Sequence, residues 1–152
     1  NQSLTKSNAI IFLNYKPCGR ADESKLLYLN DDFLNFVNLI DNSQCSSKIG
    51  FDACFVPNLM RYTKVNTNYI DPCECAFFSV YIDEKMNVKP CSFTNNETES
   101  FNLKDYKFEE IWDMKFKDIR ESRVNNCRSK CKLKVECRGG CPYFDKLNIC
   151  YS

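Results

Sequence analysis

The apolar positions of the first third of the chain follow the order strand, helix, strand. Residues 9–15 form an apolar run of strand length that ends at Lys16-Pro17-Cys18-Gly19-Arg20, as expected for a strand buried on both faces of a parallel sheet. A helical period follows in residues 31–41, with Asn30 or Asp31 as the N-cap. Residues 48–51 are then a second short strand, so the order predicts one parallel crossover unit.

A crossover unit of this size leaves both edges of its sheet uncovered. A strand pair with one helix is smaller than the units that normally fold alone, so we expect this part to pack against an upstream part of the protein or against another chain. The unit is therefore predicted to be the end of a barrel of parallel strands.

The second half of the chain predicts a hairpin and a helix. Aromatic and β-branched residues favour a strand at 77–82, and a turn at 83–87 leads to a second strand at 88–91. A helix beginning at 108 carries an apolar stripe, which we interpret as a packing surface. The stripe consists of Phe108, Ile111, Trp112, Phe116 and Ile119. The predicted fold class is α+β.

Composition excludes several classes of function. The chain of 152 residues has 21 lysines and arginines against 20 acids, so we expect neither a nucleic-acid partner nor an anionic membrane surface. The apolar run at 9–13 is too short to span a bilayer and no signal peptide precedes it, which predicts a cytoplasmic protein. Histidine is absent, which excludes Ser-His and Cys-His catalysis and histidine-containing zinc sites.

Cysteines concentrate at the end of the chain in the pattern Cys-x3-Cys-x5-Cys-x3-Cys, followed by one more. Thiols this dense form either a metal site or a disulfide knot. The total of eleven cysteines leaves one over in any all-disulfide scheme, and Gly139 and Gly140 can reach positive φ, where backbone N–H groups can point at sulfur. Both features favour metal. The five cysteines are Cys127, Cys131, Cys137, Cys141 and Cys150.

This pattern, preceded by Cys91, resembles the SPASM domain that ends many radical S-adenosylmethionine enzymes. In that family a cysteine, two strands joined by a turn and a second cysteine precede a gap and the cysteine-rich segment. Here Cys73-Glu74-Cys75 corresponds to the first cysteine of the family pattern, and the predicted hairpin ending at Cys91 corresponds to the two strands and the second cysteine. The helix predicted from residue 108 lies in the gap before the cysteine-rich segment. The turn lacks the family's glycine and the first spacer is three residues rather than two, but every thiol is kept. The resemblance covers about residues 50–152 well and 8–54 more loosely.

The resemblance implies a division and a function. Residues 1–60 would be the last strand-helix-strand part of a radical S-adenosylmethionine partial (β/α) barrel, and residues 61–152 a SPASM domain of hairpin, helix and irregular cysteine-rich tail. The substrate would be a peptide or protein side chain, as in peptide maturases and sulfatase maturases. S-adenosylmethionine and a third 4Fe-4S cluster would belong to a barrel half that this sequence lacks, because no Cys-x3-Cys-x2-Cys loop is present.

Two auxiliary 4Fe-4S clusters need eight thiolates when each iron takes one. By resemblance, Cys91 and Cys141 share the first cluster with an upstream pair, for which we prefer Cys54 and Cys73, with Cys75 as the substitute. The second cluster is held by the remaining four. The predicted metal ligands are Cys54, Cys73, Cys91, Cys127, Cys131, Cys137, Cys141 and Cys150.

Two charged residues follow the predicted strands, where barrel enzymes place their chemistry. Arg20 is a candidate to clamp a carboxylate of cofactor or substrate, although a solvated turn arginine is the simpler interpretation. Asp52 is either an acid of the site or a helix cap before residues 54–60. Cys18 and Cys45 are left as ordinary thiols.

Two other functions use the same cysteines. A structural zinc site at Cys127, Cys131, Cys137 and Cys141 would make the chain an interaction module, but it explains fewer cysteines. A ferredoxin-like electron carrier would share the clusters and leave the strand-helix-strand part without a purpose.

Overall fold

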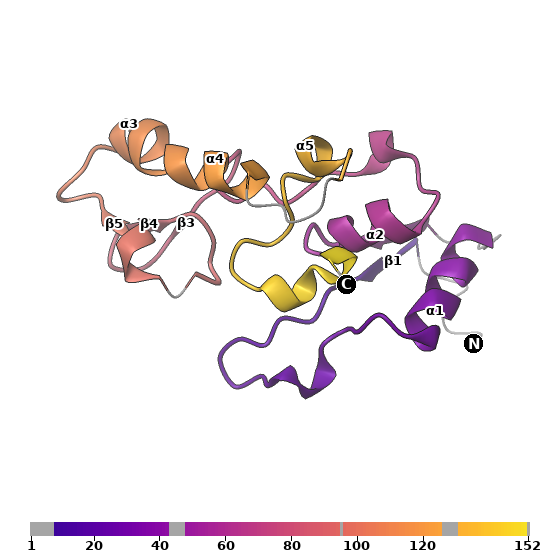
Figure 1. Cartoon of the computed structure of the whole chain (residues 1–152). Coiled ribbons are helices and arrows are strands. Elements are labelled where there is room, and N and C mark those ends of the chain that lie inside the picture. The colour runs from indigo at the N-terminus through magenta and orange to yellow at the C-terminus, as the bar shows by residue number, and fades with distance from the viewer. Residues whose placement is uncertain (1–7, 43–47, 95, 126–130, 152) are drawn as a thin grey trace. The chain divides into compact units, whose positions relative to one another are not determined.

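The chain forms two compact units in the computed structural model, which describes residues 8–42, 48–94, 96–125 and 131–151 (Figure 1). The first unit comprises Asn1–Cys73 and Phe144–Ser152, and the second comprises Glu74–Tyr143. Helices and two small sheets make the protein α+β, as the sequence predicts. The predicted domain boundary lies between residues 60 and 61. Packing units and family domains are different divisions, so that boundary stays a prediction.

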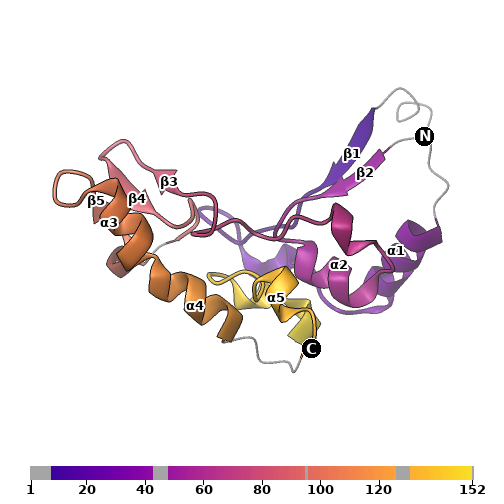
Figure 2. The same ribbon diagram turned by 90° about the horizontal axis from the view of Figure 1, so that it is seen from above.

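The first unit contains the predicted parallel crossover. Strands β1 (Ala9–Phe12) and β2 (Lys48–Phe51) pair in parallel, from Ala9 opposite Lys48 to Phe12 opposite Phe51, and α1 (Asp31–Asn42) connects them (Figure 2). Strand β1 is shorter than predicted. Beyond it, the Asn14 N–H donates to the Asp52 side chain instead of continuing the strand ladder.

The N-terminus of α1 is capped as the sequence predicts. The Asn30 side-chain oxygen accepts a hydrogen bond from the Phe33 N–H at 2.9 Å. This satisfies one of the backbone donors that the first turn of a helix leaves without an intrahelical partner. Asp31 and Asp32 in that turn also complement the helix dipole.

The core of the first unit forms where α1 and α2 (Val56–Tyr62) meet the last residues of the chain. Asn58 donates to the Leu147 carbonyl at 3.2 Å, and the Tyr62 hydroxyl donates to the Ile149 carbonyl at 3.1 Å. The sheet contributes the rings of Phe12 and Phe51, which stack on each other with ring centres 5.3 Å apart. Each also lies 5.1 Å from a ring of the helical side, Phe36 for Phe12 and Phe55 for Phe51. The buried cluster is made of Phe33, Val37, Phe55, Leu59 and Ile149.

The other side of β1 is open. The sequence predicts a strand buried on both faces, but Ile11 is 58% exposed and Leu13, just after the strand, is 73% exposed. The difference follows from the sheet having only two strands and helix packing on the side that carries Phe12 and Phe51.

The second unit is built on a small antiparallel sheet in the order β3 (Tyr81–Ile82), β4 (Asn87–Lys89), β5 (Phe101–Asn102). Strands β3 and β4 confirm the predicted hairpin, while β5 was not predicted. Strand β3 is shorter than the predicted 77–82, because residues 74–79 form a tight turn in which the Glu74 carbonyl accepts from three successive N–H groups.

Asp83 organises the hairpin turn in place of a glycine. One carboxylate oxygen accepts from the N–H groups of Lys85 and Asn87 at 3.0 and 2.9 Å, and the other accepts from the Asn87 side chain at 3.0 Å. The bonds from the Asn87 side chain and backbone, followed by that from Lys85, lower the pKa of Asp83 to about 2. Met86 takes the left-handed conformation, with φ of 67°.

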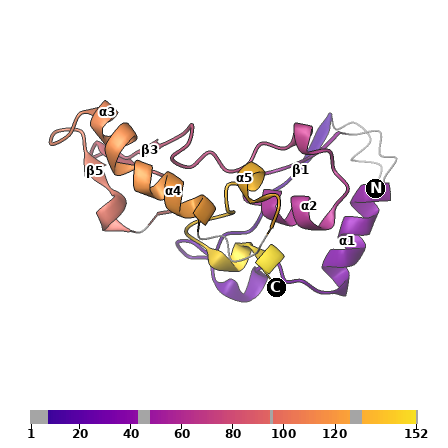
Figure 3. The same ribbon diagram turned by 45° about the horizontal axis from the view of Figure 1, so that its top comes forward.

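The predicted helix from 108 is interrupted. It consists of α3 (Phe108–Glu110), a π-helical stretch (Ile111–Lys115) and α4 (Lys117–Asn125), which follow one another in Figure 3. Ile111 and Phe116 are fully buried, which confirms the centre of the predicted stripe, whereas Phe108 is 41% exposed. A last short helix, α5 (Lys134–Cys137), lies in the cysteine-rich segment. Within the described ranges, no helix has the length and hydropathy needed to cross a bilayer.

Candidate metal centre

The cysteines are divided between the two units. Cys18, Cys54, Cys73 and Cys150 belong to the first unit. The second unit contains Cys75, Cys91, Cys131, Cys137 and Cys141. Two cysteines, Cys45 and the predicted ligand Cys127, lie outside the described residues. Among the side chains that are described, no three cysteines, aspartates or glutamates gather closely enough to hold a metal ion.

The segment after Cys137 has the backbone that the sequence predicts for a cluster-binding loop. Helix α5 ends there, and Arg138, Gly139 and Gly140 follow with φ of 54°, 76° and 77°. Left-handed conformation is easily adopted by glycine and costs energy for arginine, so Arg138 is held there by its surroundings. Nearby, the Leu133 N–H donates to the Cys131 sulfur at 3.4 Å, which is the type of contact that stabilises thiolates.

A buried arginine connects two cysteine-bearing segments of the second unit. Arg123 on α4 is only 5% exposed, and it donates to the Cys75 carbonyl at 2.7 Å and to the Gly140 carbonyl at 2.9 Å. Gly140 directly precedes Cys141. Cys75 and Cys141 are themselves 4% and 9% exposed, so one guanidinium group joins the backbones of two buried thiol positions.

Two further arginines hold the same turn at residues 74–79. Arg120 donates to the carbonyls of Ala76 and Trp112 at 3.0 and 2.8 Å. The guanidinium group of Arg138 lies 5.0 Å from the Phe77 ring centre and 4.9 Å from that of Phe78. The Ala76 backbone is left-handed, with φ of 60°, so the arginines stabilise a turn that alanine does not favour alone.

Cys91 is connected to the Cys141 segment through Glu99. The Tyr143 hydroxyl donates to Glu99 at 2.8 Å, the Thr94 hydroxyl lies 3.5 Å from the same oxygen, and the Thr94 N–H donates to the Cys91 carbonyl at 3.2 Å. Burial, the nearby Cys75 sulfur and the bond to Glu99 raise the pKa of Tyr143 well above its ordinary value, so the hydroxyl stays a proton donor. The second unit thus ties the segments of three cysteines together: Cys75, Cys91 and Cys141.

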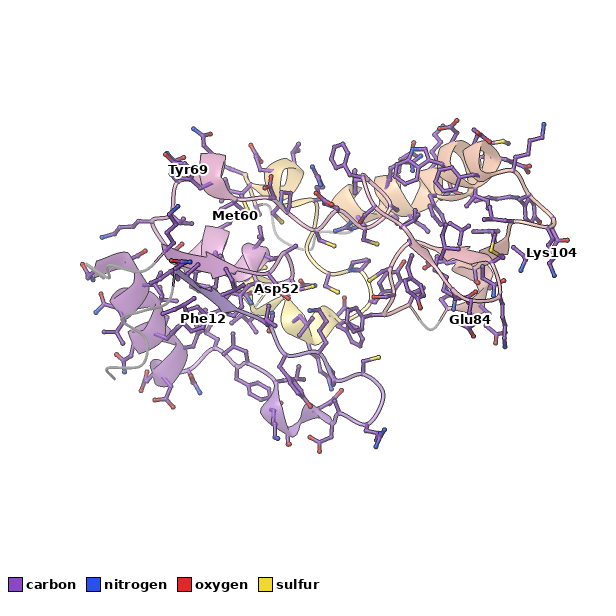
Figure 4. The ribbon with its side chains drawn as sticks, turned by 180° about the vertical axis from the view of Figure 1, so that it is seen from behind. Phe12, Asp52, Met60, Tyr69, Glu84 and Lys104 are labelled. Carbon is purple, nitrogen blue, oxygen red and sulfur yellow. The ribbon has the colours of Figure 1, made fainter. Side chains whose placement is uncertain are left out.

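Polar side chains also gather where the two parallel strands of the first unit end. Asn14, which is 4% exposed, donates from its side chain to the Cys54 carbonyl at 3.1 Å, and Lys16 pairs with Asp52 at 2.9 Å. Burial acts to lower the pKa of Lys16, but the bond to Asp52 and the neighbouring Cys54 sulfur outweigh it, so the pKa of Lys16 is raised. Figure 4 labels Phe12, the last residue of β1, and Asp52, the residue after the end of β2.

These contacts exclude one of the two sequence interpretations of Asp52 and leave the other, an acid of the site, as a prediction. Its side chain binds Asn14 and Lys16, and α2 starts without a side-chain cap, so the interpretation of Asp52 as a helix cap is wrong. Arg20 is exposed in the loop beyond Gly19 and forms no ion pair with a described residue. Its role in binding a carboxylate stays a prediction.

The arginines of α4 were missed by sequence reasoning. Arg120 and Arg123 are three residues apart, and that spacing puts both side chains on one helix face. Phe116 lies four residues before Arg120, so the continuation of the apolar stripe was the available signal that these arginines face inward.

Comparisons of this chain with protein-family models, with curated proteins and with solved structures found no match.

The donor set fits a thiolate-bound metal cluster. Soft thiols are the ligands that iron–sulfur clusters and zinc prefer. Arg138, Gly139 and Gly140 have positive φ, and the buried guanidinium group of Arg123 supplies a positive charge that would offset the negative charge of thiolates. The predicted ligands lie in both units, and Cys127 is outside the described residues. What fits a cluster is therefore the type of ligand atom and the backbone conformation near Cys137 and Cys141.

Proposed function

We propose that this chain is the auxiliary-cluster portion of a radical S-adenosylmethionine enzyme that modifies a peptide or protein side chain. One observation carries the proposal: the cysteine spacing resembles that of a SPASM domain, and its Cys137–Cys141 segment adopts three consecutive positive φ angles beside buried thiols. When bound, such clusters would supply one-electron transfer or anchor the substrate.

The residues proposed for the first cluster include Cys91 and Cys141. From the resemblance we preferred Cys54 and Cys73 as the other two donors, with Cys75 as the substitute. The bonds from Arg123 to the Cys75 and Gly140 carbonyls support Cys75 instead as one of the two, which leaves Cys54 or Cys73 as the fourth donor. The second cluster would use the remaining thiols of the cysteine-rich tail. These are Cys127, Cys131, Cys137 and Cys150.

The first unit is proposed to be the last part of a partial (β/α) barrel. Its exposed Ile11 and Leu13 support a further part of the protein, or another chain, packed on this face of β1, and an open hollow of about 440 Å³ lies beside β2. The polar cluster of Asn14, Lys16 and Asp52 lies at the strand ends, where parallel α/β folds place their ligands.

The deciding experiment is the measurement of iron, sulfide and zinc in protein purified without oxygen. Two cubane clusters predict about eight irons and eight sulfides per chain. Cys141→Ser should lower this to about four irons, because one cluster loses a ligand, whereas the matched Cys18→Ser variant should keep about eight.

Single Cys→Ser variants of the upstream cysteines identify the fourth donor. Cys75→Ser should lose the first cluster, and so should one of Cys54→Ser and Cys73→Ser. One tightly held zinc without sulfide would contradict the enzyme proposal and leave a structural interaction module.

A further inference from the structure

Three arginines of the second unit converge on one turn. Arg120 and Arg123 donate to the successive carbonyls of Ala76 and Cys75, and Arg138 lies over the rings of Phe77 and Phe78. Arg123 also lies 5.2 Å from the Phe77 ring centre, so two guanidinium groups contact that ring. The turn that carries Cys75 is therefore held from both α4 and the end of α5.

Arg123 differs from the other two because it joins two segments that each carry a buried thiol. Its two terminal nitrogens bind the Cys75 and Gly140 carbonyls, which lie far apart in sequence. The guanidinium group is planar and rigid, so the separation of its two nitrogens fixes the separation of the two carbonyls. Lysine presents a single nitrogen on a flexible stem and cannot impose that geometry.

Arg123 brings a positive charge into a buried position. At 5% exposure, solvent screens its guanidinium group poorly. Hydrogen bonds to a charged donor are stronger than neutral ones, so removing the guanidinium group takes one strong hydrogen bond from each of the two carbonyls. A positive charge at this position also favours the more negative, reduced form of any thiolate-bound cluster.

We propose that Arg123 is the positioning residue that fixes the spacing of the Cys75 and Cys141 segments before metal binds. The structure shows that Arg123 joins the backbones of the two cysteine-bearing segments, whereas the use of Cys75 and Cys141 as cluster ligands rests on the proposed function. Arg120 and Arg138 hold the turn, and Arg123 sets its distance from Cys141.

The test begins on the metal-free full chain, kept reduced and without oxygen. Native alkylation with iodoacetamide, followed by mass spectrometry, gives the labelling rate of each thiol. Wild-type protein should protect Cys75 and Cys141 relative to the half-exposed Cys18. Arg123→Met should raise labelling of both by about tenfold or more, because a lost charged hydrogen bond favours local opening by that factor.

Two variants separate positioning from general loss of stability. Arg123→Lys keeps the charge and one donor, so it should give a smaller rise in labelling, and it carries the test if the methionine variant does not fold. Arg61→Met removes a charge from the exposed side of α2 and should leave all rates unchanged. A rise that extends equally to Cys131 and Cys18 would mean general unfolding and would overturn the positioning role.

Reconstitution with iron and sulfide then tests the role toward the cluster. Arg123→Met should bind fewer irons than wild type, and any cluster retained should have a lower reduction potential, while Arg123→Lys should keep the wild-type potential. Equal labelling in wild type and Arg123→Met, or equal iron content and potential, would overturn the proposal. Altered labelling combined with no iron in wild type would instead refute the proposed function and leave the positioning role intact.

Discussion

Replacement of Phe116 by alanine tests whether the second unit has the core that its structure shows. The ring is fully buried at the junction of the π-helical stretch and α4, and its centre lies 6.0 Å from that of Phe101. Alanine removes the buried ring and leaves a cavity, which costs about 3–5 kcal/mol of unfolding free energy. A loss of that size is a large fraction of the total stability of an ordinary domain.

Phe108→Ala provides the matched control. It removes the same ring from the same helical segment, but Phe108 is 41% exposed and its ring stacks on Trp112 at 6.2 Å. Full burial of such a side chain contributes about 1.5–3 kcal/mol, so partial burial should make this substitution cost about 1–2 kcal/mol.

Urea unfolding of the reduced, metal-free chain measures both losses. The chain has one tryptophan, Trp112, which lies between the two substituted positions and reports on the second unit alone. The midpoint of the transition should fall with little change in slope. Equal losses for the two variants, or a loss below about 1 kcal/mol for Phe116→Ala, would refute the assignment of Phe116 to a core.

Three smaller perturbations test local features. Asn30→Ala should lower stability by about 1 kcal/mol in thermal unfolding, because the Phe33 N–H loses its acceptor; unchanged stability would contradict the cap. The folded-state pKa of Asp83, about 2, lies below its ordinary value of 3.8, so the carboxylate stabilises the fold above about pH 4 and this contribution is lost as pH falls toward 2. The stability difference between wild type and Asp83→Asn should therefore shrink over that range, and a constant difference would refute the assignment. Tyr143→Phe removes a bond to a carboxylate and should cost about 1.5 kcal/mol, measured by urea unfolding; a loss near zero would show that Glu99 does not hold Tyr143.

Elements that depend on local sequence were predictable. The strand at Lys48–Phe51 and helix α1 follow from apolar periodicity, and the Asn30 cap follows from a side chain that suits the start of a helix. The hairpin was also predicted, from the aromatic and β-branched residues at 77–82 and from Val88. Its turn forms without a glycine because the Asp83 side chain accepts hydrogen bonds from the N–H groups of its own turn.

Residues 77–80 show where this reasoning fails. Their aromatic and β-branched side chains favour a strand, yet Ala76 is left-handed and the Glu74 carbonyl gathers the N–H groups of the next residues into a turn. The competing interaction is tertiary, since Arg120 and Arg123 reach this turn from α4. No property of residues 77–80 themselves encodes it.

The cysteines of the candidate site were predictable from the sequence, but the arginines that hold the cysteine-bearing segments were not. Cysteine spacing is visible in sequence, but Arg123 lies in a helix of mostly charged residues that resembles a solvated surface. Its acceptors are backbone carbonyls, which every residue possesses. The bonds themselves therefore leave no sequence signature, and the only available signal is the position of Arg120 and Arg123 on the face that continues from Phe116.

The π-helical stretch Ile111–Lys115 sets the rotational phase of α4. A π turn accommodates one residue more than an α turn, and each residue in a helix advances the side-chain direction by about 100°. If the same residues were wound as one uninterrupted α-helix, everything after the stretch would be rotated by about that angle. Arg120 and Arg123 would then point away from the Cys75 turn with their chemistry unchanged. The π turn thus determines which face of α4 lies against the turn that carries Cys75.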